Sequence, residues 1–261
     1  MSQPDRATNV SRLVERDGFA VARAQLSANT VDELRSLGDS LVASNAAQSK
    51  QVLYTHEAPT TPRPALGRLM DQWLNVHRRS KQESSHGPIE ALRPAVNRWL
   101  DCDAVMFQDV WMEKRAPHAV FPWHQDFPFW PVDRPIGLIV WAPLDPVDAS
   151  NGGLHLARMS HLHGCGPPVD LHSGLSQAAD RTIEFSPSGF QVDCPELSPG
   201  DVVIFHPLTW HMSPPNRSGR RRRVWASTWL HGETRWAIER APRHPIAGVV
   251  EDGSFVREGV R

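Results

Sequence analysis

A histidine and an aspartate stand two residues apart, His124 and Asp126, inside the segment VFPWHQDFPFWP that spans residues 120–131. In a β-strand, residues i and i+2 face the same side and lie about 6.5–7 Å apart. The pattern therefore predicts that an imidazole and a carboxylate point toward one spot, while Gln125 points away. Such a pair suits a metal ion, but two ligands are not a site, so a third donor must come from elsewhere.

Several other histidines could supply the third ligand: His118, His155, His161, His163, His206, His211 and His231. His211 is favoured because it follows a predicted strand and turns toward another one. His206, which precedes Pro207 at a strand end, is its main rival and is more typical of a hydrogen-bonded structural residue. Two histidines and one carboxylate on one face of a metal, with the other positions open, are typical of non-haem Fe(II) oxygenases.

Three blocks of sequence make the pattern more specific: WHQD at 123–126, NGGL at 151–154 and GDVVIFHPLTWHMSPPNRSGRRRR at 200–223. In these blocks the chain resembles the phytanoyl-CoA dioxygenase family of Fe(II)/2-oxoglutarate oxygenases. The resemblance extends over roughly residues 10–235. It implies three iron ligands, which are His124, Asp126 and His211.

The same resemblance implies a site for the co-substrate 2-oxoglutarate. Arg222, eleven residues after the distal histidine, is the residue expected to pair with the far carboxylate of 2-oxoglutarate. Ser213 and Trp141 match positions that contact the co-substrate in relatives. The physical chemistry agrees, because a guanidinium offers a carboxylate a bidentate fork of fixed geometry.

The elements that must position these residues change character along the chain. Residues 1–102 are predicted to be largely helical, with a strand at 18–26 and helices at 9–16, 27–45, 67–80 and 86–100. From residue 103 the segments are short, β-branched or aromatic, and separated by turn residues. The predicted strands are 104–113, 118–126, 137–145, 152–158, 190–197, 200–207 and 222–230.

We therefore predict one oxygenase domain over residues 1–261, mainly β in class. Its core at 103–235 is a double-stranded β-helix, a cupin-like jelly roll, with N-terminal and flanking helices. Residues 236–261 form a C-terminal tail that lies over the barrel.

Composition excludes several partners. The chain has 28 basic and 29 acidic side chains and a formal net charge of −1, so no global field recruits nucleic acid or an acidic membrane. The run RSGRRRR at 217–223 is accordingly expected to be solvated or paired with acids, not a nucleic-acid patch. The cysteines are few, odd in number and widely spaced, and no apolar run approaches the roughly 20 residues of a membrane span. We expect a cytoplasmic protein, and the sequence leaves a homo-oligomer open.

The combined pattern predicts a non-haem Fe(II)- and 2-oxoglutarate-dependent dioxygenase. It would use O2 to oxidise, by hydroxylation in the first instance, a C–H bond of a small-molecule substrate, with release of succinate and CO2. Asp126 argues against a halogenating relative, which lacks this carboxylate. The Arg- and Pro-rich composition suggests natural-product biosynthesis, and the candidate substrate contacts are Gln108, Trp123 and Trp210.

Two other classes stay open at this point. A redox-inert cupin-like metal protein, an isomerase or hydrolase using zinc or manganese, would have no use for Arg222 and Ser213. A non-catalytic barrel that binds a small molecule would tolerate loss of Asp126 with ligand binding intact. The sequence does not select a substrate.

Overall fold

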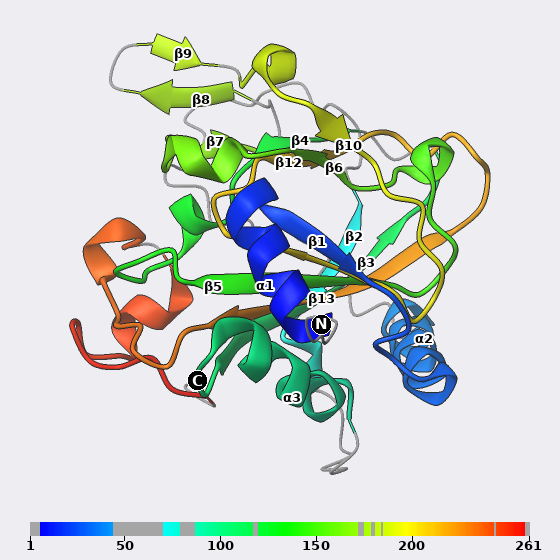
Figure 1. The fold of residues 1–261 in the computed structure, drawn as a ribbon, viewed down its shortest axis with the longest axis horizontal. Helices are drawn as coiled ribbons and strands as arrows, with labels where there is room; N and C mark the ends of the chain where they lie inside the picture. Colours follow the sequence, from blue (N-terminus) through cyan, green and yellow to red (C-terminus); the bar gives the residue numbers. More distant parts are fainter. Residues whose placement is uncertain are drawn as a thin grey trace, which may run out of the picture.

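A computed structural model describes the fold of most of the chain, covering residues 6–43, 70–78, 87–116, 120–171, 175–178, 181–183, 185–242 and 244–258. Two antiparallel sheets face each other across the middle of the molecule (Figure 1). The larger sheet has six strands in the order β1 (Phe19–Ala22), β11 (Val202–Phe205), β5 (Gly137–Pro143), β13 (Arg222–Leu230), β3 (Val105–Lys114) and β2 (Asp71–Leu74).

The smaller sheet has four strands and lies above the larger one in Figure 1. Its order is β10 (Val192–Asp193), β6 (His155–Ala157), β12 (His211–Ser213) and β4 (Phe121–His124). A three-stranded ribbon at its edge is formed by β7 (Val169–Asp170), β8 (Leu175–Ala178) and β9 (Arg181–Ile183). This arrangement confirms the predicted mainly β fold of the jelly-roll type.

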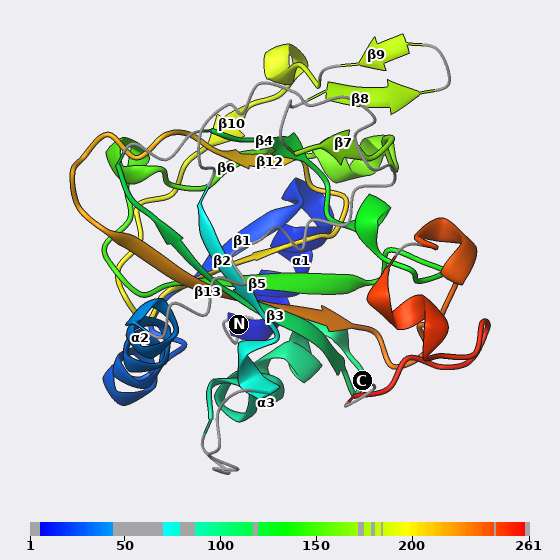
Figure 2. The same ribbon diagram turned by 180° about the vertical axis from the view of Figure 1, so that it is seen from behind.

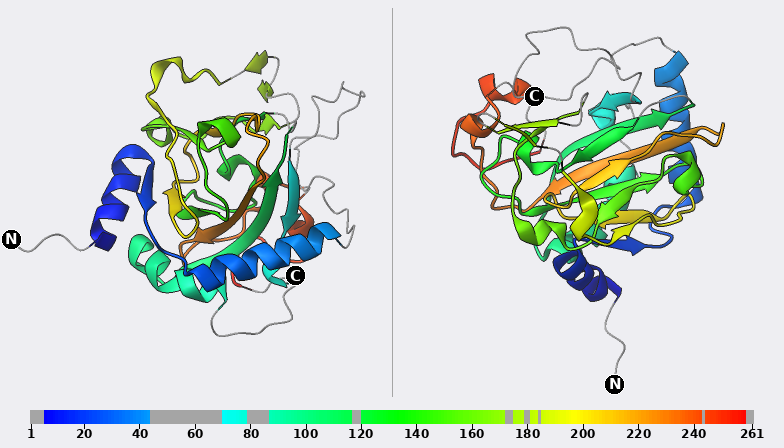
Figure 3. Two further views of the ribbon diagram at one scale, coloured as in Figure 1. Left: turned by 90° about the vertical axis from the view of Figure 1, so that its right-hand side faces the viewer. Right: turned by 90° about the horizontal axis from the view of Figure 1, so that it is seen from above.

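Three helices cover the outer face of the six-stranded sheet (Figures 2 and 3). They are α1 (Arg6–Asp17), α2 (Ala28–Ala43) and α3 (Pro88–Leu100). The predicted helices at 9–16, 27–45 and 86–100 correspond to them. Ser27 begins α2 as an N-cap, because its hydroxyl accepts a hydrogen bond of 3.1 Å from the Thr30 N–H. None of the described helices is long and apolar enough to cross a lipid bilayer.

The central strand β5 shows why the larger sheet has two cores. All seven of its residues are buried, which is typical of a strand covered on both faces. Leu138 and Val140 pack toward the helices, whereas Ile139 and Trp141 pack between the two sheets. Alternate residues of one strand therefore pack into two cores. The core between the two sheets contains the pocket described below.

The helix predicted at 67–80 is wrong over the residues that the structure describes. Residues 71–74 form β2, and Val76–Arg78 form a 3-10 turn, η1. β2 pairs with β3, and Trp73 lies opposite Trp111 with ring centroids 5.3 Å apart in an edge-on contact. A sheet edge offered these residues backbone partners and an aromatic neighbour, and that tertiary contact overrides the helical periodicity of the segment.

The end of the chain packs against one end of the sheets (Figure 1, orange to red). Trp236 forms an isolated bridge with Val132, and the His244 ring stacks on Phe107 with centroids 6.2 Å apart. The other 3-10 turns are η2 (Phe127–Phe129), η3 (Ala149–Asn151), η4 (Ser160–His163), η5 (Pro187–Gly189), η6 (Ile238–Arg240) and η7 (Pro245–Gly248).

Candidate metal centre

The register between two short strands brings the two predicted histidine ligands together. His124 is the last residue of β4 and His211 the first residue of β12, and the antiparallel pairing places them directly opposite each other. Their ring centroids are 4.1 Å apart. The three-residue strand β12 was not predicted, because a run of three residues carries no readable periodicity.

Asp126 reaches the same spot by a different route from the one predicted. It lies beyond the end of β4, at the start of η2, with helical backbone angles of φ −82° and ψ −39°. Its N–H donates to the Pro207 carbonyl at 3.2 Å. The backbone turn, not alternation within one continuous strand over 118–126, therefore aims the carboxylate at the histidines. Gln125 points away from them, as predicted, and is bonded to the loops at 164–166 and 208.

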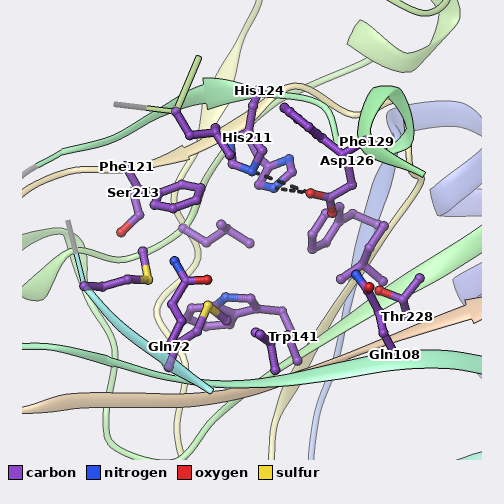
Figure 4. A pocket seen from close by; sticks show the side chains of 18 of the residues that line it. Gln72, Gln108, Phe121, His124, Asp126, Phe129, Trp141, His211, Ser213 and Thr228 are labelled. Carbon is purple, nitrogen blue, oxygen red and sulfur yellow. Dashed lines mark ion pairs between the residues drawn. The ribbon is translucent and has the colours of Figure 1, made fainter. Parts of the chain in front are cut away.

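The three donor atoms face one another (Figure 4). Oδ1 of Asp126 lies 3.5 Å from Nε2 of His124 and 3.7 Å from Nε2 of His211. Two donors bound at right angles, each about 2.1 Å from an ion, would be about 3 Å apart. A small inward adjustment thus satisfies a metal ion, and the part of the chain that the structure describes holds no other such group of His, Cys, Asp and Glu.

Backbone carbonyls hold both imidazoles in the form that a metal requires. Nδ1 of His124 lies 2.8 Å from the Pro122 carbonyl, and Nδ1 of His211 lies 2.9 Å from that of Thr209. A carbonyl only accepts, so each Nδ1 carries the proton and each Nε2 keeps its lone pair for the metal.

Burial and neighbouring groups shift the pKa values of His211 and Asp126. Burial lowers the pKa of His211 to about 4, with His124 contributing in the same direction, so this imidazole is neutral at pH 7. Burial acts to raise the pKa of Asp126, but the nearby His211 and His124 outweigh it and leave that pKa below its ordinary value. Neutral imidazoles and an ionised carboxylate are the states that bind a cation.

Arg222 enters the same pocket from β13 and is 1% exposed. Its Nη2 donates to Ser213 Oγ at 3.1 Å, and its guanidinium lies 5.6 Å from the centre of the Trp141 ring. Its Nε has no hydrogen-bond partner within the described part of the chain. Burial lowers the pKa of Arg222 to about 10, which leaves it charged at pH 7. A buried guanidinium with a spare donor is suited to bind an anion.

The metal ligands and Arg222 open into one pocket between the two sheets. Gln108, a predicted substrate contact, lies on its wall beside Thr228, its cross-strand neighbour (Figure 4). Gln72 of the unpredicted strand β2 also reaches the pocket. The rest of the wall is mainly apolar and includes Met112, Phe121, Phe129, Ile139, Leu154 and Phe205.

The other two predicted substrate contacts, Trp123 and Trp210, lie outside the pocket wall. Trp210 stacks on Phe185 with ring centroids 4.1 Å apart, and Trp123 packs on the same ring at 5.4 Å. Each tryptophan precedes a histidine ligand in sequence. Trp123 is the neighbour of His124 on β4, and because neighbouring residues on a strand face opposite sides, Trp123 points away from the pocket.

The rival histidines are used elsewhere. His206 Nδ1 accepts the Leu208 N–H at 3.1 Å, and burial, with His161 adding to it, lowers the His206 pKa to about 4. His155, His161, His163 and His231 also lie outside the metal group, and His118 falls outside the described residues.

The arginine run is held by acids. Arg221 pairs with Glu113 and with Asp39, the latter at 2.7 Å, and Arg223 pairs with Asp145 at 2.7 Å. These pairs point away from the pocket. They link α2, and the end of β5, to β13. The run is a structural network of the kind expected, with one member, Arg222, turned inward.

The comparisons with known proteins agree with this geometry. Residues 14–224 match the family model of phytanoyl-CoA dioxygenase (PhyH). The chain belongs to the PhyH family. A stretch of 104 residues is 34% identical to the peroxisomal phytanoyl-CoA dioxygenase of Rattus norvegicus, covering 37% of this PhyH-family chain but only 29% of the rat protein. The chain thus aligns with less than a third of that relative's length.

Solved structures share the PhyH-family fold at low identity. The epimerase SnoN from nogalamycin biosynthesis, in complex with Fe3+, alpha ketoglutarate and nogalamycin RO, is 16% identical, with a TM-score of 0.75 over 98% of both chains. The carbocyclase SnoK from the same biosynthesis is 13% identical, with a TM-score of 0.73 over 99% of this chain and 98% of SnoK. EctD from S. alaskensis, with 2-oxoglutarate and 5-hydroxyectoine, is 19% identical, with a TM-score of 0.63 over 90% of this chain and 80% of the EctD chain.

Lys114 is a buried residue for which the sequence predicted no role. It ends β3 and is 0% exposed, with its Nζ beside Ser213. A signal was present in the sequence, since Gln108, Met112 and Lys114 are spaced by even numbers along one strand and therefore share the inward face. A lysine on the buried face of a strand is rare without a partner, and this spacing could have identified it.

Proposed function

We propose that this chain is an Fe(II)- and 2-oxoglutarate-dependent dioxygenase that oxidises a C–H bond of a small molecule and releases succinate and CO2. The observation that carries the proposal is one pocket with two ends. One end has two imidazoles and a carboxylate, and the other has the buried Arg222 guanidinium with an unused N–H. Family membership and the printed cofactors of the similar structures SnoN and EctD support it.

The residues fit the implied groups. Nitrogen and oxygen donors without a thiolate suit ferrous iron, and three protein ligands leave coordination positions for a chelating 2-oxo acid and for dioxygen. Arg222 would hold the far carboxylate of 2-oxoglutarate, with Trp141 packed along its guanidinium. Ferrous iron with 2-oxoglutarate and dioxygen supplies the oxidising chemistry, and the protein supplies position and surroundings.

The chain's own residues orient the reactants and exclude water. The carbonyls of Pro122 and Thr209 fix the imidazoles, and the apolar wall between the sheets keeps bulk water from the metal end of the pocket. No spare acid or base stands in the described wall: Asp109 is occupied by His77 and by the Trp225 indole N–H at 2.8 Å. The proposed reaction needs none, because its oxidising power comes from the metal and co-substrate.

Hydroxylation is the outcome that we propose, although similar structures include an epimerase and a carbocyclase. Epimerisation requires that a hydrogen atom be returned to the opposite face of the carbon, commonly from a phenol or a thiol. Within the described part of the pocket wall there is neither a tyrosine nor a cysteine. Tyr54, the single tyrosine of the sequence, lies outside the described residues.

The buried arginine disfavours the redox-inert alternatives. An isomerase or hydrolase that uses zinc or manganese needs the three ligands but no second anion site, and burying an unpaired guanidinium costs free energy. A binding barrel without catalysis has no need for ligands held in metal-binding tautomers.

The proposal is tested first by binding and then by turnover. The purified protein under anaerobic conditions should bind Fe(II) and, on addition of 2-oxoglutarate, develop the visible absorption of a 2-oxo acid chelated to iron. Exposure to air with a substrate panel should then release succinate. His211→Ala should lose Fe(II) binding, and His206→Gln, a change at a histidine outside the metal group, should keep it. A wild-type protein that binds no Fe(II) or gives no 2-oxoglutarate complex would refute the proposal.

A further inference from the structure

Lys114 lies directly behind the anion end of the pocket. It is the cross-strand neighbour of Arg222 in the pairing of β3 with β13. Its stem passes against the turn at Asn151–Gly153, where a Cβ at Gly152 would come within 2.9 Å of Lys114 Cδ. Gly152 also has a positive φ of 83°. A larger residue at position 152 would collide with the Lys114 side chain, so Gly152 of the NGG turn leaves the space that this side chain occupies.

The side-chain nitrogen of Lys114 has three hydrogen-bond partners and forms no ion pair with a described residue. Nζ donates to the carbonyls of Ser213 at 2.8 Å and Pro214 at 2.6 Å and to Ser213 Oγ at 2.9 Å. These three oxygens occupy the hydrogen-bonding positions around Nζ. Among the described residues, no carboxylate lies within ion-pair distance of Lys114 or Arg222. Burial, with Arg222 adding to it, lowers the pKa of Lys114 to about 6, so the part that Lys114 plays near pH 7 rests on its hydrogen bonds and not on a full positive charge.

The hydroxyl of Ser213 connects Lys114 with Arg222. It donates its one proton to the Gly152 carbonyl at 2.8 Å, and its oxygen accepts from Lys114 Nζ and from Arg222 Nη2 at 2.9 and 3.1 Å. A hydroxyl has one donor and two acceptor sites, so this one is fully used. Ser213 has no proton left to donate to a carboxylate, and its role is to fix the position of Arg222.

We propose that Lys114 is a positioning residue for the far carboxylate of 2-oxoglutarate, acting through Ser213 on Arg222 without touching the co-substrate. The inference rests on the proposed function. Oxygens of Ser213 and Pro214 surround Lys114 Nζ, and the Ser213 hydroxyl lines the pocket beside Arg222. The N–H of Lys114 on Ser213 Oγ keeps this hydroxyl turned so that an oxygen lone pair meets Arg222.

If Lys114 has this role, its loss should affect the binding of the two ends of the co-substrate differently. Loss of Lys114 should weaken binding of the far carboxylate and leave the chelation of the 2-oxo acid end to iron unchanged. A residue needed only for folding or rigidity would affect both ends alike. The two cases are distinguished by a pair of ligands, 2-oxoglutarate and 2-oxopentanoate, which have the same five-carbon chain but differ in that a methyl group replaces the far carboxylate.

The test uses the full chain with Fe(II) under anaerobic conditions, and follows the absorption of the chelated 2-oxo acid as each ligand is titrated. For Lys114→Met we expect the dissociation constant of 2-oxoglutarate to rise about tenfold or more, and that of 2-oxopentanoate to stay within about twofold. Arg115→Met is the matched control. It removes one positive charge at the next residue, whose side chain pairs with Glu113 at 2.6 Å, and should change neither constant.

A second variant protects the test if Lys114→Met does not fold. Ser213→Ala removes the connecting hydroxyl and should produce the same selective loss of 2-oxoglutarate affinity. Equal weakening of both ligands, or no weakening, in either folded variant would overturn the inference while the proposed function stands. If the wild-type protein binds 2-oxopentanoate as tightly as 2-oxoglutarate, the anion end has no role and the inference falls. Failure of wild-type to bind either ligand refutes the proposed function itself.

Discussion

His211 lies directly opposite His124 in the antiparallel pair of β12 and β4, so the two imidazoles are cross-strand neighbours. A slip of one residue in this register would turn His211 to the other face and separate the ligands. The register depends on backbone pairs within two very short strands. Other contacts must therefore hold the segment around His124 against the loop that leads to His211, and Gln125 is placed to do so.

Gln125→Ala should weaken both the fold and the metal site. The side chain is 1% exposed and bonds to the carbonyls of Gly164 and Leu208 at 2.9 and 2.7 Å and to the Gly166 N–H at 2.7 Å. Leaving these groups unpaired should cost about 1–3 kcal/mol of unfolding free energy. Fe(II) affinity should fall about tenfold, as for other residues that orient ligands.

Urea unfolding and anaerobic Fe(II) titration measure the two effects of Gln125→Ala. Gln191→Ala is the control, since Gln191 is exposed and its side chain bonds to nearby Asp193. Unchanged iron affinity in Gln125→Ala would show that the two histidine segments keep their register without this side chain.

Arg222→Met should stabilise the protein without ligand and weaken the response to 2-oxoglutarate. Burying an unpaired cation is costly, so its removal should raise the unfolding free energy by about 1 kcal/mol. At a co-substrate concentration of about 100 times the wild-type Kd, wild-type should gain about 2.7 kcal/mol and the variant much less, because only the 2-oxo acid end is then held. Thermal unfolding of Fe(II)-loaded protein with and without 2-oxoglutarate compares the two proteins. A less stable variant, or one stabilised by 2-oxoglutarate as much as wild-type, would contradict this account.

Stability without metal should fall in mild acid, in part because of His206. Its folded-state pKa of about 4 lies below the ordinary value of 6.5, so the unfolded chain binds more protons between these limits. The contribution of neutral His206 to the free energy of unfolding is therefore complete above pH 6.5 and is lost as pH falls toward 4. His206→Gln should make the decline less steep, because glutamine does not titrate and can still accept the Leu208 N–H. Urea unfolding in chelator at pH 4.5, 5.5 and 7 measures it, and identical slopes would reject the assignment.

Gly38→Ala should destabilise the protein although alanine favours helices. Gly38 lies in α2, where an added Cβ would overlap the indole ring of Trp111. Trp111 is 0% exposed and donates its N–H to the Leu34 carbonyl at 3.0 Å, so the ring cannot retreat easily. Overpacking of about 1–3 kcal/mol outweighs the gain of up to about 1 kcal/mol in helix propensity. Urea unfolding should show a net loss, whereas the exposed control Ser36→Ala should show a small gain.

The sequence was most informative where a few residues in fixed spacing carry the chemistry. His124, Asp126 and Arg222 could be assigned because their types and spacing resemble a family pattern. The local geometry was less predictable: Asp126 is aimed by a turn bonded to Pro207, a residue far along the chain. Local periodicity contains no information about such a partner.

The wrong helix prediction over β2 has the same origin. β2 was predicted as a helix because its pairing with β3 and the contact of Trp73 with Trp111 exist only in the folded sheet. Trp123 and Trp210 were predicted as substrate contacts from their proximity in sequence to the ligands, and neither is among the residues that line the described pocket.

The pairing of Phe19 with Phe205 has a consequence for how the protein is made. β1 leaves the ribosome early, but β11, its sheet neighbour in the described part of the chain, is synthesised when most of the chain is already outside. Until then the nascent sheet has an open edge, and such distant pairings form slowly and expose apolar surface to other chains. Slow growth at low temperature should therefore favour soluble expression, and fragments that end before β11 should aggregate.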